Sequence, residues 1–347
     1  MKNFTEHLIS AKAQVREALE QLDSLGSNLT LFVVDEENRL QGTLTDGDVR
    51  RGLLKGFTIS DSVSNFMFKD FKFLPKQYKL ADIDFLKSKK IYFVPVLDEI
   101  QRISRVVNLN ERKAVIPVDA VIMAGGKGQR LKPLTDNTPK PLLMVGNKPI
   151  IEHNIDRLIE YGIDTIYITI KYLGEQLVDY FGTGESKGIS INYVKETQPL
   201  GTIGAVSLIN DFAHDTVLIM NSDLLTNIDF EEFYRNFLKE EADMSVATIP
   251  YNVAIPYAVV EKEGSRITSF KEKPIYTYYS NAGIYLVKKE LLKHLPGGEK
   301  YNATDFIDLL IQNRYNVTHF PLMAYWLDIG KFDDYHKAQT DIKSIKF

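Results

Sequence analysis

The feature that most constrains this chain is a short apolar segment followed at once by a glycine-rich turn. Residues 118–124 are almost all apolar, which suits a strand that is buried on both faces of a parallel sheet. Gly125, Gly126 and Gly128 follow, and they remove the side chains that would keep a bulky anion away from backbone N–H groups. The pattern predicts a strand whose carboxyl end opens onto a phosphate-binding loop.

Two basic residues follow the first glycines. Arg130 offers a fork-shaped set of donors, and Lys140 is a point charge held between two prolines. The spacing matches neither of the two commoner phosphate loops. A Walker loop closes with Gly-Lys-Ser/Thr, whereas Lys127 runs into Gly128, and a dinucleotide loop needs a later glycine where Arg130 and Leu131 stand. The residues predict a cradle for a triphosphate.

Composition narrows the class of partner. The chain has 347 residues, enough for two domains that each have a core. Its net charge is −4 and its basic residues are interspersed with acidic ones, which argues against a nucleic-acid partner. Cysteine is absent, the N-terminus lacks the apolar core of a signal peptide, and no apolar run reaches membrane-spanning length. We expect a cytoplasmic protein with no membrane partner.

Residues 1–113 contain two half-repeats, and the chain changes character near residues 110–117. Each half-repeat has a helical pattern followed by two strands, so we expect a small α+β domain. The expected helices carry Val15, Leu19 and Leu22 in the first half and span Leu80–Leu86 in the second. The expected strands are Leu31–Val34, Leu40–Leu44, Ile91–Val96 and Ile103–Leu109.

Residues 118–347 alternate strands with helices instead. Such alternation predicts an α/β domain with a Rossmann-like, doubly wound and mostly parallel sheet, with ligands at the carboxyl ends of the strands. Further strands are expected at Thr165–Ile170, Ile189–Val194 and Thr216–Met220, and a helix at Ile150–Ile159.

The loop Glu196–Ala205 directly follows an expected strand. Gly201 and Gly204 would let a flat ligand lie close to the backbone, and Thr202 would cap the helix that follows. An ordinary strand-to-helix turn is the alternative. A carboxylate such as Glu196 accepts hydrogen bonds from the N1–H and N2–H₂ edge of guanine, whereas an amide suits uracil or thymine better. Guanine is therefore preferred, unless Glu196 faces solvent and the backbone contacts the base.

Two aspartates stand at the ends of apolar segments. Asp223 follows Val217–Met220 closely, and Asp328 follows Tyr325–Leu327. A carboxylate in such a place is costly unless it is paired or bound to a cation, although Asp223 would also serve as a helix cap. Mg²⁺ is usually held by one or two carboxylates together with substrate phosphates. Asp223 and Asp328 therefore predict a Mg²⁺ site.

These motifs closely resemble the signature of the sugar-1-phosphate nucleotidyltransferases of the GDP-mannose pyrophosphorylase type, Gly-Gly-x-Gly-x-Arg-Leu and then Pro-Lys-Pro. The resemblance runs from about Val118 to the C-terminus and recurs in each later block. It implies an enzyme that makes an NDP-sugar and pyrophosphate from an NTP, GTP first, and a sugar 1-phosphate, for polysaccharide biosynthesis. UTP, dTTP or CTP with the same chemistry is one alternative, and a nucleotide sensor with an inactive transferase half is another. No acyltransferase domain is expected after residue 347.

The resemblance also implies roles for individual residues. Catalysis is assigned to Arg130, Lys140, Asp223 and Asp328, whose presence counts against an inactive enzyme. Nucleotide binding is assigned to Ala124, Gly125, Gly126, Gly128, Glu196, Gly201 and Thr202. Sugar-phosphate binding is assigned to Glu272, Lys273, Asn281 and Gly283. Considered alone, the charges at 271–273 are typical of a solvated turn. Tyr276, Tyr278 and Tyr279 would cover the sugar or, preferably, pack against a partner subunit.

The N-terminal half-repeats resemble a tandem pair of CBS domains, which implies a regulatory or dimerisation module and a homodimer or higher homo-oligomer. Thr45 and Asp48 have the spacing with which such domains contact the phosphate and ribose of an adenosine nucleotide. The alternative is that Thr45 caps a helix with Asp48 at its third position, as in a capping box. The second half-repeat ends at Asn110 with no matching Thr or Ser, so at most one nucleotide site is expected.

Overall fold

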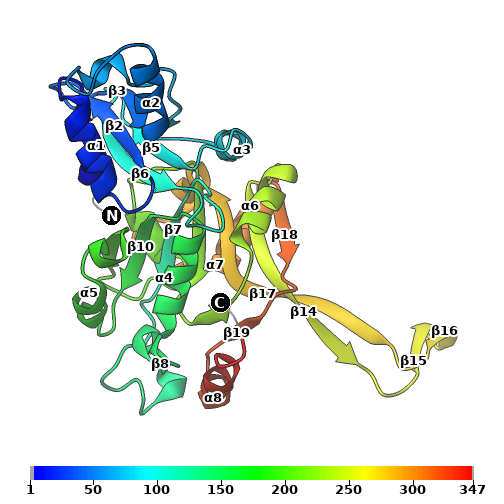
Figure 1. Cartoon of the computed structure of the whole chain (residues 1–347). Coiled ribbons are helices and arrows are strands. Elements are labelled where there is room, and N and C mark those ends of the chain that lie inside the picture. The colour runs from blue at the N-terminus through cyan, green and yellow to red at the C-terminus, as the bar shows by residue number, and fades with distance from the viewer. Residues whose placement is uncertain (1–3, 346–347) are drawn as a thin grey trace. The chain divides into compact units, whose positions relative to one another are not determined.

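The computed structural model describes residues 4–345, which form two compact units (Figure 1). The first unit contains the chain up to Pro117 together with Glu160–Asp164 and Gly184–Ser190. The second unit contains Val118–Ile159, Thr165–Thr183 and the chain from Ile191 onward. Within residues 4–345, no helix is both long and apolar enough to cross a membrane.

The first unit repeats one design twice. Each half has a three-stranded sheet in which a short first strand pairs in parallel with the second strand, and the third strand pairs antiparallel to the second. The first half contains η1 (Phe4–His7), β1 (Leu8–Ser10), α1 (Val15–Ser24), β2 (Thr30–Val34), β3 (Leu40–Thr45), α2 (Asp46–Leu54) and η2 (Val63–Asn65), where η marks a 3₁₀ helix. The second half contains β4 (Leu74–Pro75), α3 (Leu80–Ser88), β5 (Phe93–Leu97) and β6 (Ile103–Asn108).

The two halves of this unit meet in a small apolar cluster. Phe32 of β2 stacks on Phe93 of β5, with 5.6 Å between the ring centroids. Leu40 and Leu97 are buried in the same cluster. A backbone hydrogen bond of 2.9 Å from Leu40 to Gln101 continues the contact. Each half also has a buried cluster of its own, which includes Leu31 and Leu44 in the first half and Leu74 and Val96 in the second, so the shared cluster joins two separate cores.

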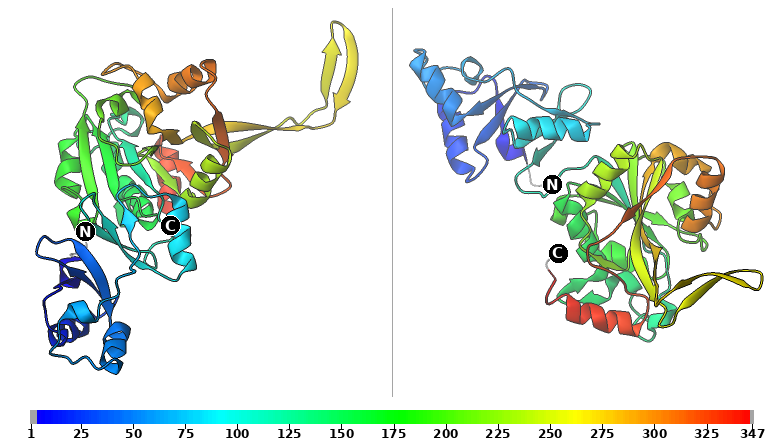
Figure 2. Two further views of the ribbon diagram at one scale, coloured as in Figure 1. Left: turned by 90° about the horizontal axis from the view of Figure 1, so that it is seen from above. Right: turned by 90° about the vertical axis from the view of Figure 1, so that its right-hand side faces the viewer.

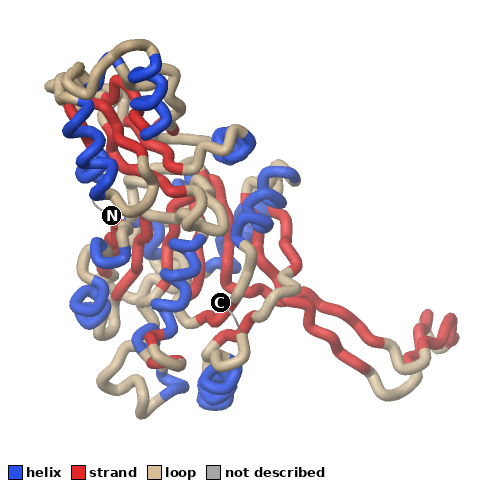
Figure 3. Tube along the Cα trace, viewed as in Figure 1, coloured by secondary structure: helices blue, strands red, loops and turns tan. Residues whose placement is uncertain are grey.

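The second unit is built on one seven-stranded sheet with the strand order β11-β10-β7-β12-β17-β14-β18. In Figure 3 the strands of this sheet lie together, with helices beside them. β7 pairs in parallel with β10 and β12, and β14 pairs in parallel with β18. β17 runs antiparallel to both its neighbours. The prediction of an α/β fold with a mostly parallel sheet is confirmed.

The elements of this unit follow the expected alternation. Its strands are β7 (Val118–Met123), β8 (Met144–Val145), β9 (Lys148–Pro149), β10 (Thr165–Ile170), β11 (Ser190–Lys195), β12 (Thr216–Asn221), β13 (Leu224–Thr226), β14 (Met244–Ala254), β15 (Val259–Glu263), β16 (Arg266–Lys271), β17 (Ile275–Lys288), β18 (Val317–Pro321) and β19 (Trp326–Asp328). Its α-helices are α4 (Ile150–Glu160), α5 (Glu175–Phe181), α6 (Phe230–Lys239), α7 (Ala303–Gln312) and α8 (Phe332–Asp341). Its 3₁₀ helices are η3 (Gln129–Leu131), η4 (Lys140–Leu142), η5 (Glu185–Lys187), η6 (Gly204–Leu208) and η7 (Lys289–His294).

β7 marks the point where the order of the strands reverses. After β7 the chain adds β10 and β11 on one side, and it then returns to place β12 on the other side. β7 and β12 pair in register, with Met123 opposite Asn221, so their carboxyl ends lie level. Ligands of open α/β sheets bind at such a reversal, outside the carboxyl ends of the strands.

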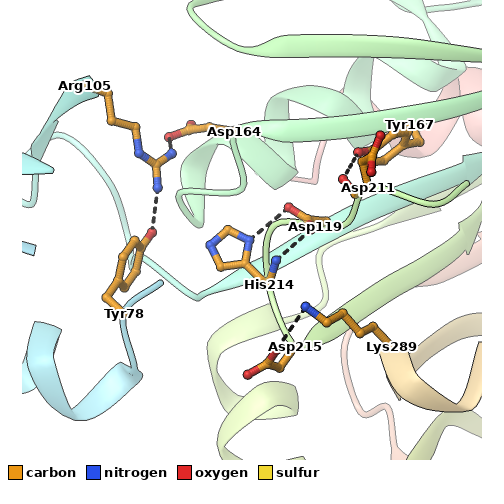
Figure 4. Close-up of polar contacts among 9 residues, drawn as sticks. All are labelled: Tyr78, Arg105, Asp119, Asp164, Tyr167, Asp211, His214, Asp215 and Lys289. Carbon is orange, nitrogen blue, oxygen red and sulfur yellow. Dashed lines mark hydrogen bonds and ion pairs between the residues drawn. The ribbon is translucent and has the colours of Figure 1, made fainter. Parts of the chain in front are cut away.

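A buried polar contact holds the other end of this strand pair. Asp119 of β7 is fully buried and accepts a hydrogen bond of 3.0 Å from the His214 backbone N–H just before β12. Its second oxygen lies 2.9 Å from His214 Nδ1 (Figure 4). Figure 4 also shows Arg105, which hydrogen bonds Tyr78 at 3.1 Å and Asp164 at 2.8 Å within the first unit. The Asp119 contact fixes the start of β12 against β7.

Candidate active site

A cavity of about 830 Å³ lies at the carboxyl ends of β7 and β12. Its wall combines the glycine loop, the loop after β11, the end of β12 and two residues from late in the chain. The lining residues are Met123, Ala124, Gly125, Gly126, Lys127, Gly128, Gln129, Arg130, Lys140, Pro141, Thr169, Lys171, Glu196, Pro199, Leu200, Gly201, Thr202, Asn221, Ser222, Asp223, Lys300 and Gly330. All the residues that the sequence assigned to nucleotide binding are therefore brought together.

The glycines of the first loop serve different purposes. Gly128 adopts a left-handed conformation with φ 59°, and a Cβ there would lie 2.9 Å from Thr135 and 3.0 Å from Lys140. Thr135 also donates a 2.9 Å hydrogen bond to the Gly128 carbonyl. A Cβ on Gly126 would meet nothing within 4 Å. Gly128 therefore makes the turn that brings Lys140 close, while Gly126 keeps the cavity floor open.

The cavity is positive although the chain is negative. Its wall carries five basic side chains, Lys127, Arg130, Lys140, Lys171 and Lys300, against two acidic ones, Glu196 and Asp223. The whole chain has a net charge of −4. A concave surface lined by one sign of charge concentrates ligands of the opposite sign. The arrangement suits a polyanion such as a triphosphate.

The two predicted metal ligands are neighbours. β13 pairs antiparallel with β19, which places Leu224 opposite Asp328. The Ile329 backbone N–H donates a 3.0 Å hydrogen bond to the Asp223 carbonyl. Lys140 forms an ion pair with Asp223, and the two side chains are 12% and 21% exposed. Two strands about a hundred residues apart in sequence thus bring both carboxylates beside the lysine of the Pro-Lys-Pro motif.

Asp328 lies in an unfavourable environment for a carboxylate. Burial raises its pKa, and the charge of Asp223 raises it further, while Lys140 and Arg130 oppose the shift. Asp328 Oδ1 is buried and has no hydrogen-bond partner among residues 4–345. A divalent cation would ligate this oxygen and relieve the repulsion, so the residues fit the predicted Mg²⁺. Within the described chain, no group of three or more acidic or histidine side chains offers an all-protein site.

Glu196 is a buried residue of the cavity wall. Burial raises the pKa of its carboxyl group, while a hydrogen bond from the Leu200 backbone N–H and the nearby Lys171 oppose the shift. The Leu200 N–H donates to Oε2 at 3.1 Å, which closes the loop after β11. A Cβ on Gly125 would lie 2.3 Å from Oε1, so any side chain there would require the Glu196 carboxylate to move. Glu196 does not face bulk solvent.

The predicted role of Thr202 as a cap of the next helix is wrong. η6 begins without a side-chain cap, and Thr202 instead accepts a 2.8 Å hydrogen bond from the Ala303 backbone N–H at the start of α7. Gly201 and Gly204 are needed for the same contact. A Cβ on them would lie 2.5 Å from the carbonyls of Tyr301 and Glu299, respectively. The loop therefore packs against a distant segment of the chain itself.

The predicted sugar-phosphate residues do not line the cavity. Glu272 and Lys273 are exposed in the turn between β16 and β17. Asn281 and Gly283 lie on β17, where the Asn281 side chain accepts a 2.8 Å hydrogen bond from the Gly283 N–H. A Cβ on Gly283 would lie 2.4 Å from Asn221, which lines the cavity. Gly283 thus stands behind Asn221 of the cavity wall, Asn281 is an exposed residue of β17, and Glu272 and Lys273 are apart from the cavity.

Thr45 and Asp48 form the capping box that was the alternative to a nucleotide site. The Thr45 N–H and hydroxyl donate to one Asp48 oxygen at 2.9 and 2.6 Å. The other oxygen pairs with Arg51 at 2.5 Å. Asp48 therefore has its hydrogen bonds satisfied within α2, and its carboxylate is engaged on both sides.

Sequence reasoning missed two basic residues of the cavity. Lys171 directly follows β10. Asp223 was predicted because it is a polar residue that follows a strand of a parallel sheet, and the same rule would have predicted Lys171. Lys300 precedes α7 in a loop that has no such signal. Only the packing of this loop against Gly201 and Gly204 brings Lys300 to the cavity.

Comparison with known proteins identifies the family. The nucleotidyl transferase family model matches residues 119–345. The chain is 32% identical to the D-glycero-alpha-D-manno-heptose 1-phosphate guanylyltransferase of Aneurinibacillus thermoaerophilus over 65% of this chain and 99% of the relative. This chain belongs to the nucleotidyl transferase family.

Two other relatives differ in the nucleotide that their names specify. The chain is 30% identical to the mannose-1-phosphate guanylyltransferase of Mycobacterium tuberculosis over 65% of this chain and 64% of that one. It is 28% identical to the UTP–glucose-1-phosphate uridylyltransferase of Synechocystis sp. over 65% of this chain and 63% of that one. The chain therefore spans slightly less than two thirds of the length of these two relatives.

Solved structures show the same fold. A Bacillus anthracis structure described as a glucose-1-phosphate thymidylyltransferase in complex with a sucrose superposes with a TM-score of 0.54 at 24% identity, over 66% of this chain and 97% of that one. HddC from Yersinia pseudotuberculosis complexed with GMP-PN superposes with a TM-score of 0.51 at 24% identity, over 65% and 99%. At this identity the likeness concerns the fold alone.

The packing of the glycine loop gives a stability prediction. Gly125→Ala places a methyl group against Glu196 Oε1, so we expect it to lower the free energy of unfolding by ~1–3 kcal/mol, the usual cost of overpacking. Gly126→Ala is the matched control, because its methyl group meets open space. Denaturant unfolding measures both variants. Equal effects of the two substitutions would contradict the close approach of Glu196 to Gly125.

Proposed function

We propose that this nucleotidyltransferase is an Mg²⁺-dependent sugar-1-phosphate nucleotidyltransferase that prefers GTP and produces a GDP-sugar and pyrophosphate. The positive cavity beside two adjacent carboxylates, at the reversal point of the sheet, is the observation that supports it most directly. The guanylyltransferase relatives support the chemistry and the choice of base.

In the proposed reaction an oxygen of the sugar 1-phosphate attacks the α-phosphorus of the triphosphate. A new P–O bond forms to the sugar phosphate as the bond to the β-phosphate breaks, and pyrophosphate leaves. The nucleophile is already an anion, so neither a general base nor a covalent intermediate is required. Catalysis then depends on holding two anions together and neutralising their charge.

The residues divide this work. The open backbone at Gly126 accepts the triphosphate, and Arg130 stabilises the departing pyrophosphate. Lys140 neutralises charge between the two reactants. Asp223 and Asp328 would hold Mg²⁺, which supplies positive charge for the phosphates when bound. Contacts with the sugar phosphate are still proposed for Glu272, Lys273, Asn281 and Gly283. Because Glu272 and Lys273 do not line the cavity, this proposal requires the turn that carries them to come close to a cavity.

The experiment that tests this function is pyrophosphate release from a grid of nucleoside triphosphates and sugar 1-phosphates. A preference for UTP, dTTP or CTP would retain the chemistry and remove the guanine assignment. No release from any pair would favour a nucleotide sensor with an inactive transferase half. Against that alternative, Arg130, Lys140, Asp223 and Asp328 are all present and lie together.

The carboxylate pair gives a prediction for catalysis. Asp223→Asn and Asp328→Asn should each lower kcat by ~100-fold or more, because a catalytic cation is worth several kcal/mol. Asp328→Asn should unfold at the same temperature as the parent or higher, since burial and, second to it, the charge of Asp223 disfavour the ionised carboxylate and raise its pKa. Asp215→Asn, at a side chain that is 87% exposed, is the control.

Thermal unfolding in a MgCl₂ titration supplies a second readout. Mg²⁺ should raise the Tm of the parent protein and of Asp215→Asn, and it should have a smaller effect on Asp223→Asn and Asp328→Asn. Near-normal pyrophosphate release by these two variants would show that the carboxylate pair is not the metal site.

Glu196 gives a prediction for base selection. Glu196→Gln keeps an acceptor for the Leu200 N–H but adds donors that do not match the guanine edge. Selection of GTP over UTP should weaken by ~1–3 kcal/mol, the range for a good bidentate base contact. Glu175→Gln, at an exposed ion pair with Lys195, is the matched control. Steady-state kcat/KM values measure the selection.

The same carboxyl group should make base selection depend on pH. Burial raises the pKa of Glu196, so it gains a proton at a higher pH than an ordinary glutamate as the solution is acidified. The protonated group accepts less well from guanine, so GTP selection should fall through this range in the parent protein. The selection of GTP by Glu196→Gln should not change with pH. If GTP selection by the parent protein did not change with pH either, this would contradict base contact by Glu196.

We also propose that residues 1–113 are a tandem CBS pair with a regulatory or dimerisation role, that residues 118–347 are the catalytic domain, and that the protein acts in the cytoplasm. The repeated three-stranded design supports the pair, and the absence of cysteine suits a reducing compartment. Thr45 and Asp48 would contact an adenosine nucleotide only if their capping box opened.

Calorimetric titration of the full chain with AMP, ADP and ATP tests the regulatory site. Binding that is tighter than millimolar and lost in Asp48→Asn would place the nucleotide there. Asp82→Asn, at the third position of α3 in the second half-repeat, is the matched control. If no adenosine nucleotide binds, the module is better regarded as a dimerisation element.

A further inference from the structure

The most unusual surface of the described chain is a long two-stranded projection, here called the arm, which comprises residues 250–280. Beyond the sheet, β14 and β17 continue as a ribbon that carries the hairpin β15–β16 at its end (Figure 2). Nine of the 25 large apolar side chains that are exposed among the described residues lie on it, although it is less than a tenth of the chain. They are Tyr251, Val253, Tyr257, Val260, Ile267, Phe270, Ile275, Tyr278 and Tyr279.

The ribbon part of the arm has an aromatic face. Tyr251 pairs with Tyr278 and Val253 with Tyr276. Side chains of directly paired residues share a face, and residues two apart along a strand share it as well. These four side chains therefore form one apolar stripe. Tyr251 and Tyr278 are 62% and 60% exposed, so the rest of the chain leaves the stripe largely uncovered.

The tip of the arm is amphipathic. Val260 pairs with Phe270, and both are exposed on one face. On the other face Glu261 forms a 2.5 Å ion pair with Lys271 and accepts a 2.6 Å hydrogen bond from Ser269. A hairpin of two strands is at best marginally stable in water unless an apolar face is covered. The polar network marks the side that faces water, and the apolar side requires a partner.

The exposed apolar area of the arm is in the range of an interaction site. Five of the nine side chains are aromatic, each offering ~150–250 Å² of surface, so at about half exposure the stripe and the tip together present on the order of several hundred Å², while Ile275 and Tyr279 lie on the opposite face of the ribbon. A standard interface buries about 800 Å² on each partner. Exposed apolar patches of more than a few hundred Å² mark interaction sites.

The arm also carries chemistry that the cavity of its own chain lacks. No residue of β14 to β17 lines the cavity. Glu272 and Lys273, at the turn that ends the tip hairpin, form no hydrogen bond or ion pair within the described chain. Under the proposed function these two residues should meet the second reactant at a cavity. A partner that covers the arm and has such a cavity is a second copy of this chain.

We infer that the arm of each copy packs on a second copy and delivers Glu272 and Lys273 to the cavity of that copy, so that each active site is shared by two chains. The inference rests on the proposed function for the role of these two residues. Reciprocal exchange of identical arms gives a closed two-fold dimer. Without a partner, the cavity lacks Glu272 and Lys273.

Complementation between two variants tests the inference. Lys273→Ala damages the arm, and Arg130→Ala damages the cavity, so each variant alone should lose at least about tenfold in activity. After mixing and subunit exchange, half the dimers are mixed, and each mixed dimer has one intact cavity served by one intact arm. The mixture should recover about a quarter of parental activity. Lys271→Ala, two residues away on the polar face, is the control and should remain active.

No recovery, with exchange verified by differently tagged chains, would mean that each arm serves its own cavity and would overturn the inference. Activity of the parent protein is measured first, so failure of the proposed function is recognised separately.

A second measurement needs no activity. The chain has no cysteine, so Glu272→Cys and Lys300→Cys introduce single reactive thiols. A short bismaleimide should join the two variants into a covalent dimer when they are mixed. A double variant with both cysteines provides the contrary outcome. If the reagent joins the two cysteines within one chain and no covalent dimer forms, the inference is overturned.

Discussion

The site depends on the parallel pairing of β7 with β12. These strands come from segments almost a hundred residues apart, and the chain between them fills the other side of β7. Their register sets Met123 level with Asn221, so the glycine loop and the segment before Asp223 leave the sheet side by side. The buried Asp119–His214 contact fixes the opposite end of the same strand pair. If this register slipped, the glycine loop and Asp223 would separate.

A smaller strand pair completes the charge pattern. β13 and β19 pair over only three residues, yet this brings Asp328 beside Asp223. Two carboxylates in a partly buried place repel one another, and the raised pKa of Asp328 records that cost. Lys140 and Arg130 offset part of the repulsion. Asp223 and Asp328 therefore form an electrostatically unfavourable pair next to a surplus of positive charge. Binding of a cation together with a polyanion would compensate both charges.

The loop after β11 shows how one glycine-rich segment can be interpreted in two ways. From sequence, Gly201 and Gly204 were expected to admit a ligand, and Thr202 to cap the next helix. In the structure the glycines admit the carbonyls of Tyr301 and Glu299, and Thr202 caps α7. These contacts bring Lys300 to the cavity and hold the loop that carries Glu196. The loop is thus built by packing within the chain, and its nucleotide-binding role is supported by its place in the cavity wall.

The sequence by itself determined the local elements and the family. Apolar runs, glycine spacing and alternation predicted β7, β10, β11, β12 and α4 within a residue or two, because period and turn chemistry are local properties. The same patterns placed Asp223 and Asp328 at strand ends and matched the family motifs. Only tertiary structure decided which distant segments meet. It brought Asp328 beside Asp223 and Lys300 to the cavity, satisfied Asp48 at the start of α2 and left Glu272 and Lys273 on an exposed arm. The physical reason is that strand pairing and side-chain packing between distant segments depend on the whole sheet, whereas a motif records only its own neighbours.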